Sequence, residues 1–408
     1  MDEKKNVLYI SYDGMTDPLG QSQVIPYLLA LSRKGVSFTI LSFEKKARYA
    51  ERKAHVQDIL DSAGIQWAPL TYTKSPPVLS TLYDYFRMKR KASGLHKLMN
   101  YSLVHCRSYI PAMAGLVMKR KYHLPFIFDM RGFWADERVD GHLWNLKNPL
   151  FKSIYRFFKK KEIAFLKESA AVISLTSAAK DEIRKWHSLQ IESAKITVIP
   201  CCVDTMLFDP AKVTSDQQES ARHQLNLKKD EFILGYLGSI GTWYMLDEML
   251  QFFRLLKQEI GEAKFLFVTE DNPQGIKDKA CQFDINAEDI IITKAERKHV
   301  PLMISLFSCG IFFIKPAYSK IASSPTKQGE IMAMGVPVIC NSGVGDSDQI
   351  VRRYNSGFIV PAGDYSSVVK EISVVGVDKQ TIRYGATDYF SLDKGVGEYL
   401  NVYRSILK

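Results

Sequence analysis

Short apolar runs alternate with longer amphipathic stretches along almost the whole chain. The runs are rich in Val, Ile, Leu and Phe and have the length of buried strands. The longer stretches repeat apolar residues every three or four positions, which is typical of helices packed on one face. Such a pattern predicts parallel sheets covered by helices on both faces. The first set of predicted strands comprises residues 7–12, 38–43, 103–106, 126–130, 171–175 and 196–200, and the helices predicted beside them are 23–34, 48–63, 79–98, 112–122, 150–168 and 178–186.

The pattern starts again after a polar segment near the middle of the chain. Because residues 200–231 contain Pro210 and the polar run 214–220, we expect a connection there rather than a core element. We therefore predict two doubly wound, Rossmann-like α/β domains, residues 1–205 and 206–388, that face each other across a cleft. Residues 389–408 are predicted to form a helix that either completes the second domain or crosses back to the first. The second set of predicted strands comprises residues 232–237, 264–269, 290–293, 311–314, 336–340 and 357–360, with helices at 246–258, 300–307, 327–334 and 365–374.

Composition narrows the class of protein. The chain has 408 residues, 46% hydrophobic and 24% charged, which is typical of a soluble globular protein of two domains. The six cysteines lack the spacing of metal ligands, and residues 1–5 lack the apolar core of a signal peptide, so we expect a cytoplasmic protein without a zinc site. A net charge of +11 predicts an anionic partner, with simple solubility as the alternative.

The segment 323–338 predicts a phosphate-binding helix start in the second half. Pro325 suits the first turn of a helix, with Ser324 as its N-cap, and Gly335 closes that helix before the next strand. The free N–H groups of such a start favour a phosphate, and Thr326 and Lys327 add a hydroxyl and a positive charge. Glu330 lies one turn further and is placed to accept two hydrogen bonds from a ribose diol. The alternative is a plain capping box, a common helix start without a ligand.

The same residues resemble a known family. Ser-Pro-Thr-Lys-Gln-Gly-Glu (324–330), followed by Met-Gly-Val-Pro-Val (334–338), is similar to the donor motif of family 4 (group 1) glycosyltransferases, which have the GT-B fold. Residues 198–204 resemble the end of that family's first domain, residues 235–241 the loop that opens its second, and residues 390–403 its terminal helix. The resemblance implies a retaining transferase that uses a nucleoside diphosphate sugar, most often a UDP-sugar, and requires no metal or other cofactor.

Two positions depart from the family pattern. Ala322 stands where the family has an acid close to the donor sugar, and residues 241–244 lack the Arg and Lys that many members use at the diphosphate. We expect Lys327 to supply the missing charge, with Lys294 or Lys315 as alternatives. We expect the loop at Gly238 and Ser239 to help stabilise the leaving diphosphate.

The first half holds two candidate segments, each directly after a predicted strand. Gly20 lies in the turn 13–23, and the resemblance implies that it lies against the donor diphosphate and sugar; the alternative is an ordinary strand-to-helix turn. The strand 126–130 ends in Asp129 and Arg131, whose charges we expect at the carboxyl edge of the sheet. Arg131 is expected to contact the sugar or a phosphate, with Asp129 as its orienting partner or as a polar sugar ligand. The alternative is an ion pair that only fixes the loop.

Two predicted helices of the first half combine basic and large apolar residues. They are 79–98, with five cations between Arg87 and Lys97, and 150–168, with six between Lys152 and Lys167. This composition is typical of helices that lie on an anionic membrane, and the alternative is a surface helix with one face packed on the sheet.

Together these features predict transfer of a hexose or N-acetylhexosamine to an acceptor hydroxyl of a lipid-linked or polysaccharide precursor. The expected partners are a nucleotide sugar, a glycan or lipid-linked acceptor and an anionic membrane surface, without nucleic acid. A sugar-nucleotide epimerase of the same fold and a non-catalytic sugar-nucleotide-binding protein remain as alternatives. The dinucleotide fingerprint Gly-x-Gly-x-x-Gly is missing, which disfavours a dehydrogenase.

Overall fold

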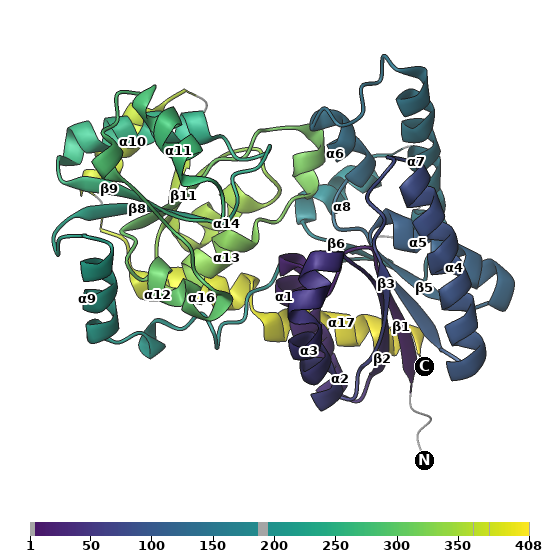
Figure 1. The fold of residues 1–408 in the computed structure, drawn as a ribbon. Helices are drawn as coiled ribbons and strands as arrows, with labels where there is room; N and C mark the ends of the chain where they lie inside the picture. Colours follow the sequence, from purple (N-terminus) through teal and green to yellow (C-terminus); the bar gives the residue numbers. More distant parts are fainter. Residues whose placement is uncertain (1–4, 187–194, 362, 375, 408) are drawn as a thin grey trace. The chain divides into compact units, whose positions relative to one another are not determined.

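The computed structural model describes residues 5–186, 195–361, 363–374 and 376–407. The chain divides into two compact units, and each is built on one parallel sheet (Figure 1). The first unit contains Met1–Pro200 and Leu392–Lys408, and the second contains Cys201–Ser391. The prediction about a signal peptide falls on residues 1–5, of which only Lys5 is described.

The first unit has a seven-stranded sheet in the order β3-β2-β1-β4-β5-β6-β7, with all pairs parallel. The chain leaves β1 toward one edge and returns at β4, so the strand order reverses between β1 and β4. Ligands of doubly wound sheets bind at this reversal, outside the carboxyl ends of the strands. The strands are β1 (Asn6–Ser11), β2 (Ser37–Glu44), β3 (Gln66–Thr71), β4 (Leu103–Arg107), β5 (Phe126–Asp129), β6 (Ala171–Ser174) and β7 (Ile196–Val198).

Strand β3 is the one strand of this sheet that the apolar pattern did not predict. It lies at the sheet edge, pairs only with β2, and exposes or half-exposes every residue. It also contains Pro69, which is tolerated at an edge because one side of the strand makes no ladder hydrogen bonds. An edge strand of this kind lacks the continuous apolar run that marks the other six.

Helices cover both faces of the first sheet. Figure 1 shows α4, α5 and α7 on one side and α1 to α3 on the other. The predicted helix 23–34 is two helices, because the chain turns at Val24. The helices between the strands are α1 (Pro18–Gln23), α2 (Ile25–Arg33), α3 (Lys46–Ser62), α4 (Leu79–Met99), α5 (Tyr109–Tyr122), α6 (Trp134–Asp140), α7 (Pro149–Glu168) and α8 (Ser177–Arg184).

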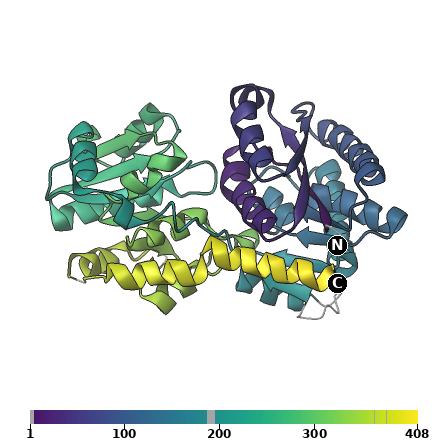
Figure 2. The same ribbon diagram turned by 90° about the horizontal axis from the view of Figure 1, so that it is seen from below.

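The last helix of the chain, α17 (Leu392–Ile406), belongs to the first unit. It packs against α2 and places Tyr399 and Tyr403 against His105 of β4. Lys5, just before β1, donates to the carbonyl of Leu407. Figure 2 shows this helix, in yellow, alongside the elements of the first unit.

The second unit has a six-stranded parallel sheet in the order β10-β9-β8-β11-β12-β13, which reverses between β8 and β11. All six strands coincide closely with the predicted runs. They are β8 (Phe232–Leu237), β9 (Ala263–Val268), β10 (Ile290–Thr293), β11 (Cys309–Phe312), β12 (Val338–Asn341) and β13 (Gly357–Val360).

Two apolar cores lie on opposite faces of this sheet, because alternate strand residues point to opposite sides. Phe265 and Phe267 enter the core under α10, whereas Leu266 and Val268 enter the core under α13. Figure 1 shows α10 and α11 above the sheet and α12, α13 and α16 below it. The helices are α9 (Ser215–Gln224), α10 (Leu246–Ile260), α11 (Pro273–Cys281), α12 (Val300–Ile304), α13 (Thr326–Ala333), α14 (Ser347–Tyr354), α15 (Tyr365–Val374) and α16 (Lys379–Tyr389).

The polar run 214–220, expected to be a connection, is instead the start of α9. Thr214 accepts from the backbone of Gln217, whose side chain accepts from the backbone of Thr214, a complete capping box. The cap stabilises a helix that has few apolar residues, of which only Ala221 is buried.

Candidate functional site

The loop after β8 forms one wall of the candidate site in the second unit. Gly238 follows the strand with a φ of +93°, a conformation that other residues rarely adopt. The side chain of Ser239 donates to Asp271 over 2.9 Å, and the N–H of Ile240 donates to the other carboxylate oxygen over 2.7 Å. Asp271 therefore fixes this loop at the carboxyl edge of β8, at the point where the strand order reverses.

Lys327 points toward the same loop from α13. A Cβ added at Gly238 would lie 3.8 Å from its Nζ. The Nζ lies 4.0 Å from the ring centre of Tyr236 and 3.4 Å from that of Tyr244. The Nζ is buried and makes no hydrogen bond to any described residue. Burial holds the pKa of Lys327 well below its usual value, although Glu330 and Asp271 act in the opposite direction.

Two aromatic faces thus hold a cation that lacks a hydrogen-bond acceptor. Cation–π contacts stabilise a desolvated ammonium in part, yet all three of its N–H groups stay available. An unpaired buried charge raises the free energy of the folded state, and an anion bound beside it would lower that free energy again.

The start of α13 differs by one residue from the prediction. Pro325 occupies the N-cap position, and Thr326 is the first helical residue. The hydroxyl of Ser324 does not cap the helix; it accepts from the N–H of Cys201 over 3.1 Å. Gly329 keeps this helix close to Phe390, because a Cβ there would lie 2.9 Å from the Phe390 ring. The residues expected to bind phosphate, Thr326 and Lys327, begin the first helical turn.

Glu330 lies on the next turn of α13 and is only 5% exposed. Its Oε1 accepts from Nη1 of Arg297, whose guanidinium also lies 4.6 Å from the ring centre of Phe208. Arg297 begins a short 3-10 turn after β10, far away in sequence, and the amino-acid pattern gave no signal for this pairing. The pair orients the Glu330 carboxylate and occupies only one of its two oxygens.

The other candidate cations lie at different places. Lys294 directly follows β10, Lys315 lies three residues after the end of β11, and both are exposed. A further lysine that sequence reasoning missed, Lys320, is buried in the 3-10 turn Tyr318–Ala322, and its Nζ lies 3.6 Å from the ring centre of Trp243. Ala322, the departure from the family pattern, is buried at the end of that turn. The two lysines of this region that lie against aromatic rings are therefore Lys320 and Lys327.

Asp129 is the centre of the candidate site in the first unit. It ends β5 and is 1% exposed. Its Oδ2 accepts from the hydroxyl of Tyr399 over 3.2 Å and lies 3.4 Å from Nε2 of His105. The other nitrogen of His105 lies 2.6 Å from the hydroxyl of Tyr403. The terminal helix α17 therefore supplies two hydroxyls to a network that lies beneath the carboxyl edge of β4 and β5.

Charges around this network set its protonation. Burial alone would raise the pKa of Asp129, but Arg131, His105 and Arg107 together hold that pKa below its usual value. Burial lowers the pKa of His105, which favours the neutral ring. A neutral His105 that donates from Nε2 to Asp129 accepts from Tyr403 at Nδ1.

Arg131 lies beside Asp129 in a strained turn. Its backbone has a φ of +57°, which is uncommon for a residue with a side chain, and Gly132 follows with +119°. Its Nη1 lies 3.9 Å from Oδ1 of Asp129, and its side chain is 10% exposed. The structure therefore brings the two residues together, with the carboxylate accepting from interior groups on one side and facing the guanidinium on the other.

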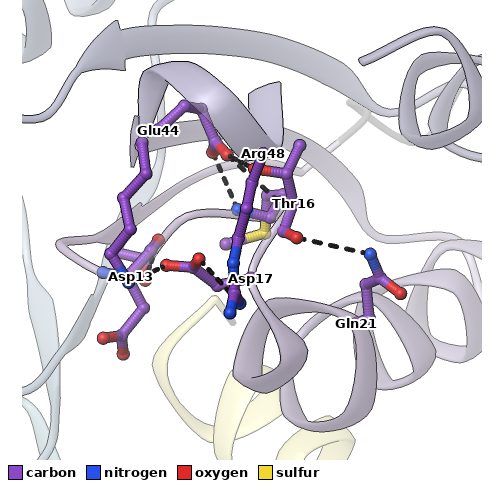
Figure 3. Close-up of polar contacts among 9 residues, drawn as sticks. Asp13, Thr16, Asp17, Gln21, Glu44 and Arg48 are labelled. Atoms are coloured by element: carbon purple, nitrogen blue, oxygen red, sulfur yellow. Dashed lines mark hydrogen bonds and ion pairs between the residues drawn. The ribbon is translucent and has the colours of Figure 1, made fainter. Parts of the chain in front are cut away.

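The loop after β1 is fixed by a carboxylate that the sequence did not indicate. Glu44, at the end of β2, accepts from the N–H of Met15 over 2.7 Å and from the hydroxyl of Thr16 over 2.5 Å (Figure 3). A Cβ at Gly20 would lie 2.2 Å from the carbonyl oxygen of Gly14. Gly20 therefore allows α1 to pack closely against its own loop, while the buried Asp17 pairs with Lys45 and Arg48.

The two carboxylates at the start of α14 have structural partners. Asp346 precedes α14, and its carboxylate accepts from Tyr389 over 2.8 Å, while Asp348 pairs with Arg352. Within the described ranges, no group of three or more His, Cys, Asp or Glu side chains is arranged to hold a metal ion. All six cysteines are free thiols. Over the same residues, none of the helices combines the length and the apolar character that a bilayer crossing requires.

Solved structures share the fold of the whole chain. A glycosyltransferase from Rickettsia africae ESF-5 superimposes with a TM-score of 0.71 at 18% identity, covering 99% of both chains. Anabaena HepE, in complex with UDP and glucose, gives a TM-score of 0.70 at 12% identity and covers 98% of this chain and all of its own. At these identities the likeness establishes the fold, two Rossmann-like α/β units of the GT-B type.

Sequence comparisons identify the family. The capsular polysaccharide biosynthesis glycosyltransferase CapM of Staphylococcus aureus is 24% identical over 166 residues, which cover 40% of this chain and 41% of CapM. The match thus spans about two fifths of that relative. Residues 23–207 match the model of Glycosyltransferase Family 4, and residues 217–380 match that of Glycosyl transferases group 1. The two models cover successive parts of the chain, and on this evidence the protein belongs to the family 4, group 1 glycosyltransferases.

Proposed function

We propose that this glycosyltransferase moves a hexose or N-acetylhexosamine from a nucleoside diphosphate sugar, UDP-linked in the first instance, to a hydroxyl of a lipid-linked or polysaccharide precursor. The choice of uridine is supported by HepE, which has been described with UDP and with UDP-glucose. The choice of acceptor is supported by CapM, whose role is capsular polysaccharide biosynthesis.

One observation carries the proposal: the buried Nζ of Lys327 has two aromatic faces beside it and no hydrogen-bond acceptor among the described residues. A diphosphate oxygen is an acceptor that matches this cation in charge and in hydrogen bonding. The position also agrees with the physical expectation for the fold, because α13 starts where the strand order reverses between β8 and β11.

The neighbours of Lys327 suggest how the rest of the nucleotide is held. Thr326 and the loop at Gly238 and Ser239 are proposed to donate to the diphosphate, and Ser324 to fix the chain that precedes the helix. Glu330 is proposed to accept from the ribose hydroxyls with the oxygen that Arg297 leaves available. We rank Lys320 above Lys294 as a second cation near the diphosphate, since Lys294 is exposed. These donors would stabilise the charge that develops on the leaving group.

In the first domain, Arg131 is proposed to contact the donor sugar or a phosphate, with Asp129 orienting it. The strained turn at Arg131 supports this role, because backbone strain persists where surrounding structure maintains it and is concentrated at functional sites. Gly20 is proposed to lie near the donor through its backbone. Retention of the anomeric configuration is proposed on the family's behaviour, without a carboxylate nucleophile, since Ala322 replaces the acid of the family pattern.

A thermal-shift series tests donor recognition. Ligands that bind the folded state raise its melting temperature, and at a fixed concentration the rise grows with the logarithm of the affinity. We expect UDP and UDP-sugars to raise it more than UMP, and uridine least. Equal shifts for uridine and UDP would contradict a diphosphate site at Lys327.

Proton NMR of the product then tests the reaction. Incubation of the preferred UDP-sugar with an acceptor should give a glycoside whose anomeric configuration equals that of the donor. Inversion would contradict the retaining mechanism. Formation of an epimeric sugar nucleotide in the absence of any acceptor would contradict transfer itself.

A further inference from the structure

The first two turns of α4 carry an exposed apolar stripe. Leu79, Leu82, Tyr83 and Phe86 expose 63%, 49%, 56% and 51% of their surface. Their spacing of three and four residues places them on one face of the helix. The opposite face is buried in the first unit and consists of Ser80, Asp84, Met88 and Ala92. Monomeric proteins rarely expose a group of large apolar side chains in this way without a function.

Cations surround this stripe. The Nζ of Lys89 lies 5.0 Å from the ring centre of Phe86, and the guanidinium of Arg87 lies 5.3 Å from that of Tyr83. Arg90 and Lys97 follow Phe86 by four and eleven residues, so both continue its face along the helix. The one acidic residue of α4, Asp84, is fully buried and accepts from Thr73 and Arg87. The exposed face therefore combines apolar and positive groups without a negative one.

The second basic helix of the first unit, α7, uses its apolar residues differently. Phe158, Phe165 and Leu166 are buried, and Lys159 pairs with Asp136 over 2.8 Å. This helix packs these three apolar residues into the first unit, but it also exposes 57% of Leu150 and 46% of Phe157. Of the two helices, α4 is the one that exposes four large apolar side chains within two turns, whereas the two exposed apolar residues of α7 are seven positions apart.

We propose that the N-terminal half of α4 docks the protein on an anionic lipid surface. The four apolar side chains would enter the boundary between headgroups and acyl chains, and Lys89, Arg90 and Lys97 would contact lipid phosphates. A purely apolar partner surface would bury the rings but leave the adjacent cations without counter-charge. An anionic bilayer satisfies both kinds of group at once. The proposal rests on the proposed function, because a lipid-linked acceptor of that reaction would lie in such a surface.

Vesicle co-sedimentation of the full chain tests the proposal. Binding should be strong to vesicles of phosphatidylcholine with phosphatidylglycerol and weak to phosphatidylcholine alone. The double variant Leu82→Ser/Phe86→Ser should lower the partition to anionic vesicles at least roughly tenfold. The triple variant Lys89→Gln/Arg90→Gln/Lys97→Gln should remove the preference for anionic over neutral vesicles.

A matched control removes equally exposed side chains elsewhere. Val374 and Tyr384 of the second unit expose 83% and 63%, and Val374→Ser/Tyr384→Ser should bind vesicles as the unmodified protein does. Equal partition of the Leu82/Phe86 variant and the unmodified protein would overturn the proposal, as would equal binding to both vesicle types. A dimer without lipid that this variant dissociates, seen by sedimentation velocity, would assign the stripe to a second copy instead. UDP binding measured on the same samples separates a failure here from a failure of the donor site.

Discussion

The carboxyl edges of the two sheets hold their charges in different ways. In the first sheet, Oδ2 of Asp129 contacts Tyr399 and His105, whereas Oδ1 makes no hydrogen bond to a described residue and lies 3.9 Å from Nη1 of Arg131. Beside the second sheet, Lys327 has two aromatic faces and, within the described part of the chain, no hydrogen-bond acceptor. A buried carboxylate that accepts hydrogen bonds on one oxygen and faces a cation with the other is held in place, whereas a buried cation without an acceptor favours the arrival of an anion. The comparison assigns positioning to the first edge and diphosphate binding to the second.

The largest effect is expected for Lys327→Met, which keeps the apolar stem and removes the charge. UDP affinity should fall about 100-fold, the scale of a lost charge-assisted contact of about 3 kcal/mol. Uridine affinity should barely change, and the ligand-free variant should be at least as stable, because a buried unpaired charge has been removed. Calorimetric titration and thermal unfolding measure both effects. The exposed Lys315→Met is the matched control, and an equal loss of UDP affinity there would contradict the assignment.

The lowered pKa of Lys327 adds a pH dependence to this prediction. The folded state binds fewer protons than the unfolded state between the depressed pKa and the usual 10.5, so ligand-free stability should rise with pH across that window. A diphosphate beside Lys327 should raise its pKa again, so UDP binding should take up protons within the window. Titration in buffers of different ionisation enthalpy measures this uptake, and Lys327→Met should lose it.

A smaller effect is expected for Asp129→Asn, which keeps the shape of the network. Turnover should fall about 30-fold because Arg131 loses its charged partner, while UDP affinity should change little. Because the pKa of Asp129 is lowered in the folded state, its contribution to stability is present above the usual 3.8 and is lost as pH falls through the lowered value. The stability gap between the two proteins should therefore narrow in acid, which unfolding midpoints at several pH values would show.

Glu330→Ala should weaken all uridine nucleotides about tenfold, because the ribose is common to them. This pattern differs from that of Lys327→Met, which spares uridine. Equilibrium binding of uridine, UMP and UDP to both variants separates the two roles. A loss confined to UDP in Glu330→Ala would instead assign the carboxylate to the diphosphate region through Lys327.

The smallest effect is expected for Tyr399→Phe, which removes one hydrogen bond to Asp129. Turnover should fall about threefold with KM for the donor unchanged, since Tyr399 acts on Arg131 only through Asp129. Tyr354→Phe is a matched control, because Tyr354 donates to Asp388 over 2.5 Å in the second unit. If both variants lose the same turnover, the effect of Tyr399 is general stability and not positioning.

The sequence predicted the architecture because buried strands carry their own apolar signal. All six strands of the second sheet and six of seven in the first were predicted, and β3 was missed because its edge position needs no apolar run. The candidate residues Lys327 and Glu330 were found through local helix chemistry. Their long-range partners were not: Tyr236, Tyr244 and Arg297 reach them through tertiary packing.

The difference between local signals and tertiary packing also explains which residues of the site in the first unit could be predicted. Asp129 and Arg131 are neighbours in sequence at a strand end, and their proximity could be predicted. Glu44, His105 and Tyr399 lie on other elements, and each of these residues taken alone reads as an ordinary core or helix position. The greater apolar exposure of α4 than of α7 likewise depends on which face packs, which two similar amphipathic sequences do not specify.

A crystal structure with UDP bound tests the central claim most directly. We predict a diphosphate oxygen within hydrogen-bond distance of Nζ of Lys327 and a ribose hydroxyl within that distance of Glu330. Tyr236 and Tyr244 should keep their contacts with the lysine stem. A diphosphate bound away from Lys327, with its Nζ still facing only the two rings, would contradict the account.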